Sequence, residues 1–210
     1  MALKEESAGS LDHIVTFVEQ EMLKSIRLKQ AFLNSGASLV AQIGNAVLTC
    51  FKRGGKLLLF GNGGSAADAQ HIAAEFVGRY QLDRRALPAM ALSVNSSTVT
   101  AVANDYGYEE VFARQIRAFG TANDVAIGIS TSGNSASVIR GLVAARGLGM
   151  LTIGMTGSSG GKLKPIVDFC ICVPSNDTPR IQECHSLVGH ILSAYCEKIV
   201  STESTVLAKG

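Results

Sequence analysis

His71 and Glu75 are a pair of side chains whose types and spacing suit chemistry. Residues at positions i and i+4 share one face of a helix, so this spacing places an imidazole beside a carboxylate. Such a pair can move protons between neighbouring atoms of a substrate. It can also be an ordinary surface contact, worth about 0.2–0.5 kcal/mol. Because the pair follows an apolar run and a glycine-rich turn at residues 58–64, the segment favours an enzyme that acts on a phosphorylated small molecule.

The glycine-rich turn joins a predicted strand to the predicted helix that carries this pair. The turn consists of Asn62, Gly63, Gly64 and Ser65. A helix N-terminus offers free N–H groups and a partial positive charge to an anion, and glycines let the backbone approach that anion closely. Ser65 and Asp68 also have the spacing of a capping box. The turn therefore predicts a phosphate-binding site.

Two nucleotide-binding motifs are matched only in part. The dinucleotide fingerprint is present at Gly61, Gly63 and Ala66, but no carboxylate follows the next predicted strand, where a ribose would need one. The P-loop pattern fails at residues 157–162, because the glycine spacing is wrong and Leu163 stands where Ser or Thr is required. Both cofactor classes are disfavoured.

A second polar loop follows the predicted strand at residues 124–129. It contains Ser130, Thr131, Ser132 and Ser135. Hydroxyl and backbone N–H groups at a strand-to-helix turn can form a phosphate nest, although an ordinary capped turn has the same composition. Parallel strands end at the same edge of a sheet, where ligands of α/β proteins bind. We therefore expect the two loops to open onto the same ligand-binding edge of the sheet.

The predicted C-terminal helix, at about residues 179–202, supplies further polar side chains. They are Gln182, Glu183, His185 and His190. Each of them can be an ordinary surface or core residue. Two histidines with one carboxylate would suit a divalent metal ion, but the spacing from His71 to Glu75 is a weaker metal signal than the HExxH motif. Residue types alone leave a metal site open.

The elements that must position these residues follow an alternating pattern. Helical periodicity covers residues 11–33, 37–52, 65–79, 97–118 and 135–146, and short apolar runs cover 56–60, 89–94, 124–129, 150–154 and 167–173. Short apolar runs alternating with helices are typical of a parallel sheet covered on both faces. The sequence predicts one α/β domain over residues 1–210, with a five-stranded parallel sheet sandwiched by helices. An N-terminal helical hairpin begins with a helix at 1–35, and the core spans 36–200.

Composition limits the classes of function. The chain has 210 residues, of which 47% are hydrophobic and 17% charged, with a net charge of +2. This composition is globular. Scattered Lys and Arg argue against nucleic-acid binding, and no apolar run reaches the ~20 residues of a membrane span. The N-terminus lacks a signal-peptide core, and five cysteines in mostly apolar surroundings favour reduced thiols in a cytoplasmic protein.

Four segments together resemble the phosphoheptose isomerases, which have the sugar isomerase (SIS) fold. They are residues 61–75, 103–107, 130–135 and 180–190. The resemblance runs from about residue 37 to residue 200 with its segments in order, and the first ten residues stand outside it as an extension. It implies conversion of sedoheptulose 7-phosphate to D-glycero-D-manno-heptose 7-phosphate. This is the first step towards ADP-heptose and the lipopolysaccharide core.

The resemblance also implies roles for individual residues. Glu75 would be the base and His190 the acid, and a zinc ion would lie among His71, Glu75, Gln182 and His190. The substrate would contact Asn62, Gly63, Gly64, Ser65, Glu75, Asn104, Asp105, Ser130, Thr131, Ser132, Ser135 and Gln182. The family further implies a homotetramer with active sites between subunits, and no organic cofactor.

Two points remain open. Gln182 and His190 lie about 12 Å apart along a straight helix, which strains a ligand set that contains both. The replication-initiator-associating proteins share the fold and bind other proteins without catalysis; this chain keeps a carboxylate at position 75 and the serine loop, which favours the enzyme. A sugar-phosphate-sensing or amino-sugar isomerase relative is the other alternative.

Overall fold

The computed structural model describes the backbone of residues 2–207 and the side chains of residues 11–202. Its elements are α1 Ala2–Lys52, β1 Leu57–Gly61, α2 Gly64–Val77, β2 Ala89–Ala91, α3 Ser96–Tyr106, η1 Tyr108–Glu110, α4 Val111–Phe119, β3 Val125–Ile129, α5 Ala136–Gly147, β4 Leu151–Thr156, η2 Lys164–Ile166, β5 Phe169–Cys172 and α6 Thr178–Leu207. Each predicted apolar run overlaps one strand, although β1 and β4 extend one and two residues beyond their predicted ends. The chain therefore has the predicted α/β class.

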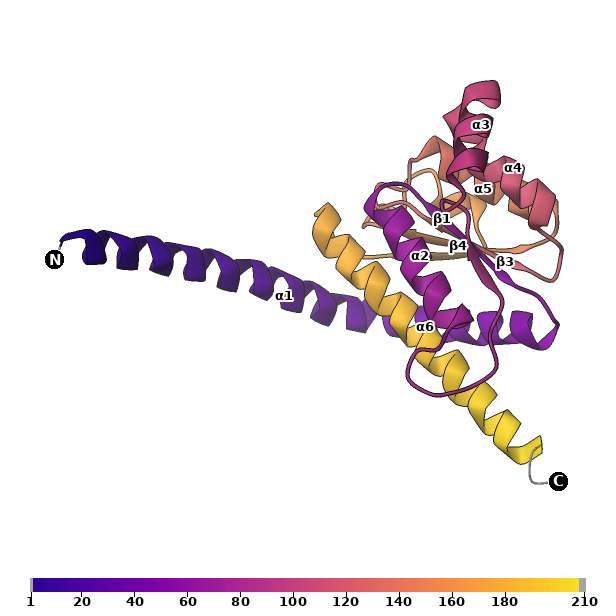
Figure 1. Cartoon of the computed structure of the whole chain (residues 1–210), viewed down its shortest axis with the longest axis horizontal. Helices are drawn as coiled ribbons and strands as arrows, with labels where there is room; N and C mark the ends of the chain where they lie inside the picture. The colour runs from indigo at the N-terminus through magenta and orange to yellow at the C-terminus, as the bar shows by residue number, and fades with distance from the viewer. Residues whose placement is uncertain (1, 208–210) are drawn as a thin grey trace.

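The five strands form one parallel sheet in the order β2-β1-β3-β4-β5. One row of the register pairs Phe60 with Gly128, then Gly154, then Cys170. Alternate residues of each strand face opposite layers. Helices α1, α2 and α6 bury one face, and α3, α4 and α5 cover the other (Figure 1). This arrangement confirms the predicted sandwich and brings the carboxyl ends of β1 and β3 to one edge.

The predicted N-terminal hairpin is wrong, because the helices expected at 11–33 and 37–52 are one continuous helix, α1. Gly36 costs about 1 kcal/mol relative to alanine inside a helix, which does not break it. The ring of Phe32 lies over Gly36, where a Cβ atom would overlap it, and the Ser35 hydroxyl bonds back to a carbonyl of the preceding turn. Packing of the second half of α1 on the sheet then holds the helix straight.

The helix predicted at 97–118 is divided into α3 and α4. Gly107 ends α3 with a φ of 91°, a conformation that side-chain-bearing residues rarely adopt. The 3-10 turn η1 follows and redirects the chain into α4. This break places Tyr108 at the start of η1, above the carboxyl edge of the sheet.

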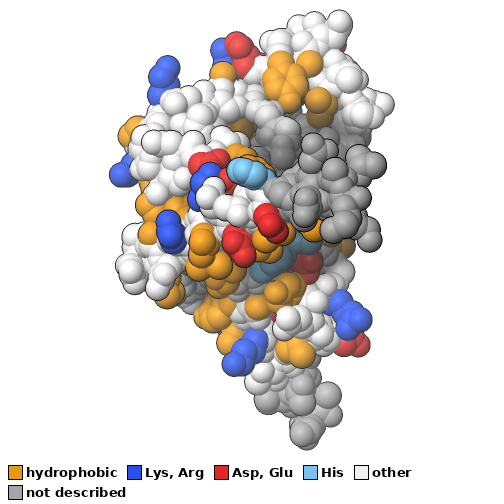
Figure 2. Space-filling view, turned by 90° about the vertical axis from the view of Figure 1, so that its left-hand side faces the viewer, with side chains coloured by type: hydrophobic (Ala, Val, Ile, Leu, Met, Phe, Trp, Pro, Cys, Tyr) orange, Lys and Arg blue, Asp and Glu red, His pale blue; other side chains and the backbone are white. Residues whose placement is uncertain are grey.

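The first half of α1 extends away from the rest of the molecule (Figure 1). Its exposed apolar side chains include Leu11, Ile14, Phe17, Met22 and Ile26. Seen from that side, charged side chains are scattered among exposed hydrophobic ones rather than gathered by sign (Figure 2). Within residues 2–207, no helix combines the length and the apolar character needed to cross a bilayer.

Candidate active site

Helices α2 and α6 lie side by side and run in the same direction (Figure 1). Ser186 on α6 donates to Asp68 on α2 at 2.7 Å, a sequence separation of 118 residues. One turn further, Gly189 lies so close to Ile72 that a Cβ atom there would overlap its side chain. The helices therefore meet in register, and each turn of one faces a fixed turn of the other.

His71, Glu75 and His190 meet at the next contact between these helices. The Nε2 atoms of His71 and His190 are 2.8 Å apart, so one ring donates a hydrogen bond to the other. His71 Nε2 lies 3.7 Å from Glu75 Oε1. The His71 side chain is half exposed, whereas Glu75 is 19% exposed. The structure thus brings together three of the residues named from the sequence, across 119 positions.

The same three side chains have the composition of a metal site. One ligand atom from each lies within 4.8 Å of the other two. Two imidazole nitrogens and one carboxylate oxygen are donors that suit zinc. The donor chemistry therefore fits the ion that the resemblance implies.

Gln182 lies two turns before His190 and touches the glycine-rich turn. Its amide contacts Gly64 so closely that a Cβ atom on this glycine would overlap it. This position suits a contact with bound substrate at the phosphate loop. A role for Gln182 as a fourth metal ligand stays a prediction.

The predicted capping box at the start of α2 is wrong. Gly63, with a φ of 55°, occupies the N-cap position and makes no side-chain cap bond. Asp68 instead accepts from Ser186, and its buried position raises the pKa of the Asp68 carboxyl against the effect of that bond. Ser186 on α6 therefore binds the Asp68 carboxylate in place of the helix start, and no side chain caps the N–H groups of the first turn of α2.

The two polar loops join through Asn62. Its Nδ2 atom donates to the hydroxyls of Ser135 at 2.7 Å and Ser137 at 3.0 Å. The Tyr108 hydroxyl donates to Asn62 Oδ1 at 2.8 Å. The Ser130 hydroxyl accepts a hydrogen bond from the backbone N–H of Ser135 at 3.4 Å, which closes the serine loop on itself. The loops after β1 and β3 are thus adjacent, as the sequence predicts.

The serine loop rests on the loop after β4. Gly133 has a φ of 65°, and a Cβ atom there would overlap the carbonyl oxygen of Gly160. The Asn134 side chain accepts from the Lys162 N–H at 3.1 Å. The segment that fails as a P-loop therefore serves as a support for the serine loop.

Substituting Gly133 by alanine is expected to lower the melting temperature and weaken phosphate binding. The left-handed φ costs about 1–3 kcal/mol for alanine, and the overlap with Gly160 adds to this. Gly147→Ala is the matched control, since nothing lies within 4 Å of its Cβ position. Thermal unfolding and inorganic-phosphate titration measure both effects. Equal behaviour of the two variants would contradict the role given to Gly133.

The other predicted residues are placed as follows. Asn104 donates to Asp105 at 2.9 Å near the end of α3, close to Tyr108 but without a hydrogen bond to the two loops within residues 11–202. His185 is fully buried and lies 3.2 Å from the Thr156 carbonyl. Burial lowers the pKa of His185 to about 4, so its ring is neutral and structural.

Two residues of the loop network, Tyr108 and Ser137, are missing from the sequence prediction. Ser137 lies two positions after Ser135 and could have been found as a further hydroxyl at a helix start. Tyr108 has no such signal, because it reaches Asn62 across 46 residues only through the break at Gly107.

Comparison with known proteins identifies the class of this fold and site. The SIS domain family matches residues 22–157. The phosphoheptose isomerase of Roseiflexus sp. is 52% identical over 192 residues, covering 91% of this chain and 98% of that protein. The chain is therefore an SIS-domain protein, and it belongs to the phosphoheptose isomerase family, a family of isomerases.

Solved structures agree with this assignment. The phosphoheptose isomerase of Neisseria gonorrhoeae matches with a TM-score of 0.83 and 41% identity, covering 88% of this chain and 99% of that one. The phosphoheptose isomerase of Francisella tularensis matches with a TM-score of 0.83 and 36% identity, over 90% and 98%. The resemblance inferred from four sequence segments is confirmed.

Proposed function

We propose that this protein converts sedoheptulose 7-phosphate to D-glycero-D-manno-heptose 7-phosphate. The observation that carries the proposal is the meeting of His71, Glu75 and His190 between α2 and α6, where α2 is the helix that begins at the first of two adjacent phosphate-type loops. The names of the similar proteins support the heptose phosphate as substrate. By the same resemblance the reaction is the first step towards ADP-heptose and lipopolysaccharide core, in the cytoplasm.

The reaction moves one proton between adjacent carbons and one between their oxygens, and it needs no oxidant. The Glu75 carboxylate removes a proton from C1 of the ketose, which gives a cis-enediol, and returns it to C2 of the aldose. His190 donates a proton to the oxygen on C2, and the imidazole then takes the proton from the oxygen on C1. Since both groups end in their starting states, the cycle closes without a further reactant.

The phosphate loops would hold the other end of the substrate. The proposed contacts are Asn62, Gly63, Gly64, Ser65, Ser130, Thr131, Ser132, Ser135 and Gln182, with Asn104 and Asp105 nearby. Binding energy from this end can orient the carbons that react at Glu75.

We propose zinc as the metal, held by His71, Glu75 and His190. When bound, zinc acts as a Lewis acid that stabilises charge on substrate oxygens. By the resemblance, Glu75 and His190 would serve both as ligands of the ion and as the proton-transfer groups. The three described donors leave room for a further ligand, for which Gln182 is the sequence-based candidate.

A direct assay tests this function. Purified protein is incubated with sedoheptulose 7-phosphate before and after removal of metal by a chelator, and again with zinc added. The expected result is aldose formation that chelation reduces and zinc restores. Absence of aldose under all three conditions would reject the proposed substrate, whereas turnover unaffected by chelation would reject zinc.

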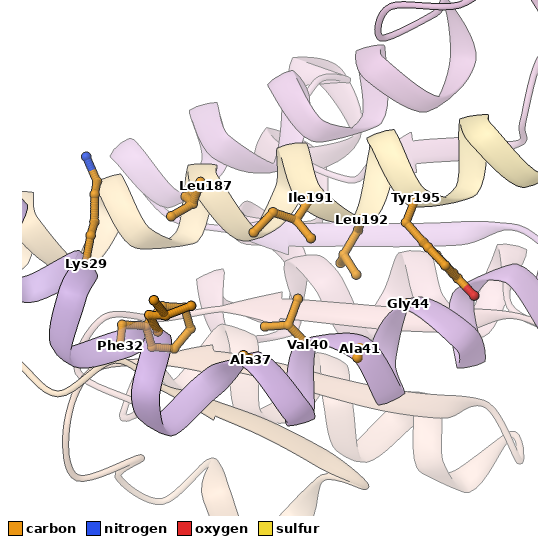
Figure 3. Close-up of a pocket in the computed structure, with 11 residues that line it drawn as sticks. Lys29, Phe32, Ala37, Val40, Ala41, Gly44, Leu187, Ile191, Leu192 and Tyr195 are labelled. Atoms are coloured by element: carbon orange, nitrogen blue, oxygen red, sulfur yellow. The ribbon is translucent and has the colours of Figure 1, made fainter.

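We propose further that four copies assemble through α1. Its outer half exposes a row of apolar side chains, and an apolar groove of about 360 Å³ lies between α1 and α6 (Figure 3). Side chains from Val40 on α1 and from Leu192 and Tyr195 on α6 line this groove. Burying such surface contributes roughly 25 cal/mol per Å². A second copy of α1 is the occupant that these matched apolar surfaces favour.

Glutamates at Ile14 and Phe17 are expected to prevent this assembly. Both side chains are more than half exposed, so charges there cost little in a single chain but would be buried in a tetramer. Thr16→Glu is the control, because Thr16 lies about 160° round the helix from Ile14 and about 100° from Phe17. Light scattering should give a tetramer for the parent and the control and a smaller species for the double variant; a tetrameric double variant would exclude this interface.

A further inference from the structure

A buried ion pair lies behind the reacting cluster. Arg84, in the segment after α2, has a fully buried side chain, and Glu197 on α6 is 1% exposed. Arg84 Nε and Glu197 Oε2 are 3.5 Å apart. Removing two charges from water costs several kcal/mol per ion, so a buried pair by itself is weak evidence for stability. Hydrogen bonds to backbone groups compensate this desolvation cost, and they identify the segments that the pair holds in place.

Arg84 binds the last turn of α2. Its Nη2 atom donates to the carbonyl oxygen of Glu75 at 2.8 Å. Its Nη1 atom donates to the carbonyls of Phe76 at 2.8 Å and Gly78 at 2.9 Å. Carbonyls at a helix C-terminus lack intrahelical partners and carry partial negative charge, which a guanidinium satisfies. Arg84 thereby fixes the backbone of the residue that carries the reacting carboxylate.

Glu197 binds the segment that leads from α2 to Arg84. Its carboxylate accepts backbone N–H bonds from Tyr80 at 2.7 Å and from Gln81 and Leu82 at 2.6 Å. Burial acts to raise the pKa of Glu197, but these bonds and Arg84 outweigh it and lower the pKa, so the group is ionised. The ring of Tyr80 then lies 5.5 Å from the ring of His190, centre to centre.

We propose that the Arg84–Glu197 pair is a positioning device that holds Glu75 and His190 in the geometry for proton transfer. Arg84 acts through the Glu75 carbonyl, and Glu197 acts through Tyr80, whose ring borders the His190 imidazole. Neither member of the pair touches the reacting side chains. The expected effect of the pair on turnover rests on the proposed function. Its expected effect on the geometry of Glu75 and His190 rests on the contacts alone.

Removing both charges tests the proposal. Arg84→Leu with Glu197→Leu avoids leaving one buried charge unpaired, which would cost far more stability than loss of the pair. The matched control is Lys56→Leu with Asp124→Leu. Asp124 is 2% exposed, pairs with Lys56 at 2.7 Å and accepts backbone N–H bonds, but it lies at the opposite, amino end of the strands.

The double variant at Arg84 and Glu197 should lose about 10- to 100-fold in kcat, because small displacements of reacting groups have effects of this size. KM and inhibition by inorganic phosphate should stay within about twofold, since the loops are untouched. Arg84→Lys, which keeps the charge but loses the two Nη donors of the guanidinium, should give an intermediate kcat. A kcat equal to that of the Lys56/Asp124 control at similar melting temperature would overturn the proposal.

Ring-nitrogen NMR provides a readout that needs no turnover. The chain has only four histidines, so their signals can be assigned by substitution. The signals of His71 and His190 should shift in the Arg84/Glu197 variant, while those of His185 stay in place. Unchanged His190 signals would overturn the proposal even if the wild-type protein fails to isomerise the heptose phosphate, an outcome that would reject only the proposed function.

Discussion

Glu75→Gln is expected to lower kcat for sedoheptulose 7-phosphate by about 10²–10⁴-fold, the contribution of a general base. Glutamine has nearly the same shape and keeps an oxygen near His71, but it cannot accept the proton from C1. The loops that bind phosphate stay intact, so KM and phosphate inhibition should change little. Steady-state kinetics with direct measurement of the aldose checks the result.

A matched glutamate-to-glutamine control is available on α1. Glu21 pairs with Lys24 at 2.6 Å and lies outside the reacting cluster, so Glu21→Gln should keep wild-type kcat. Near-normal turnover in Glu75→Gln would remove this carboxylate from the mechanism. A loss in KM alone would instead make Glu75 a binding residue.

His190→Ala should cause the second large loss, again of about 10²–10⁴-fold in kcat. The substitution removes the proposed acid and also the ring that contacts both His71 and Tyr80. His190→Gln keeps more of the packing and separates the two effects. That milder variant should still lose most of kcat, because glutamine cannot donate the proton.

His13 on the exposed part of α1 gives the control for this experiment. His13→Gln should leave kcat unchanged, because the side chain lies outside the cluster. If His190→Gln retains the wild-type kcat, the acid must be another group. The assignment of Glu75 would survive that outcome, since the two roles are measured separately.

Local patterns predicted the parts of the site that lie close together in the chain. The turn at Asn62 and the spacing from His71 to Glu75 could be predicted from the sequence, because strand, turn and helix follow one another within about 20 residues. The resemblance to the family then added His190. The helix that carries it packs on α2 through Ser186 and Gly189, contacts that no local pattern contains.

Long-range competition explains what the sequence did not predict. Asp68 has the spacing of a cap, but Ser186 from α6 binds it instead. Arg84 and Glu197 look like ordinary charges until the fold buries both, across 113 positions of sequence. His185 and His190 are equivalent in sequence, and only their faces of α6 make one a neutral core residue and the other a partner of His71.

The parallel packing of α2 and α6 also limits where the length of this chain can change. Gln182 faces Gly64, Ser186 faces Asp68 and His190 faces His71, so the sequence separation between facing residues stays at 118 or 119 along the two helices. One inserted residue in either helix would turn every side chain beyond it by about 100°. The apolar side chains between the two helices would then no longer pack against each other, and the reacting groups would no longer meet. We therefore expect insertions and deletions to be tolerated only in loops outside this helix pair, because the pair sets the distance between the phosphate loops and the reacting end.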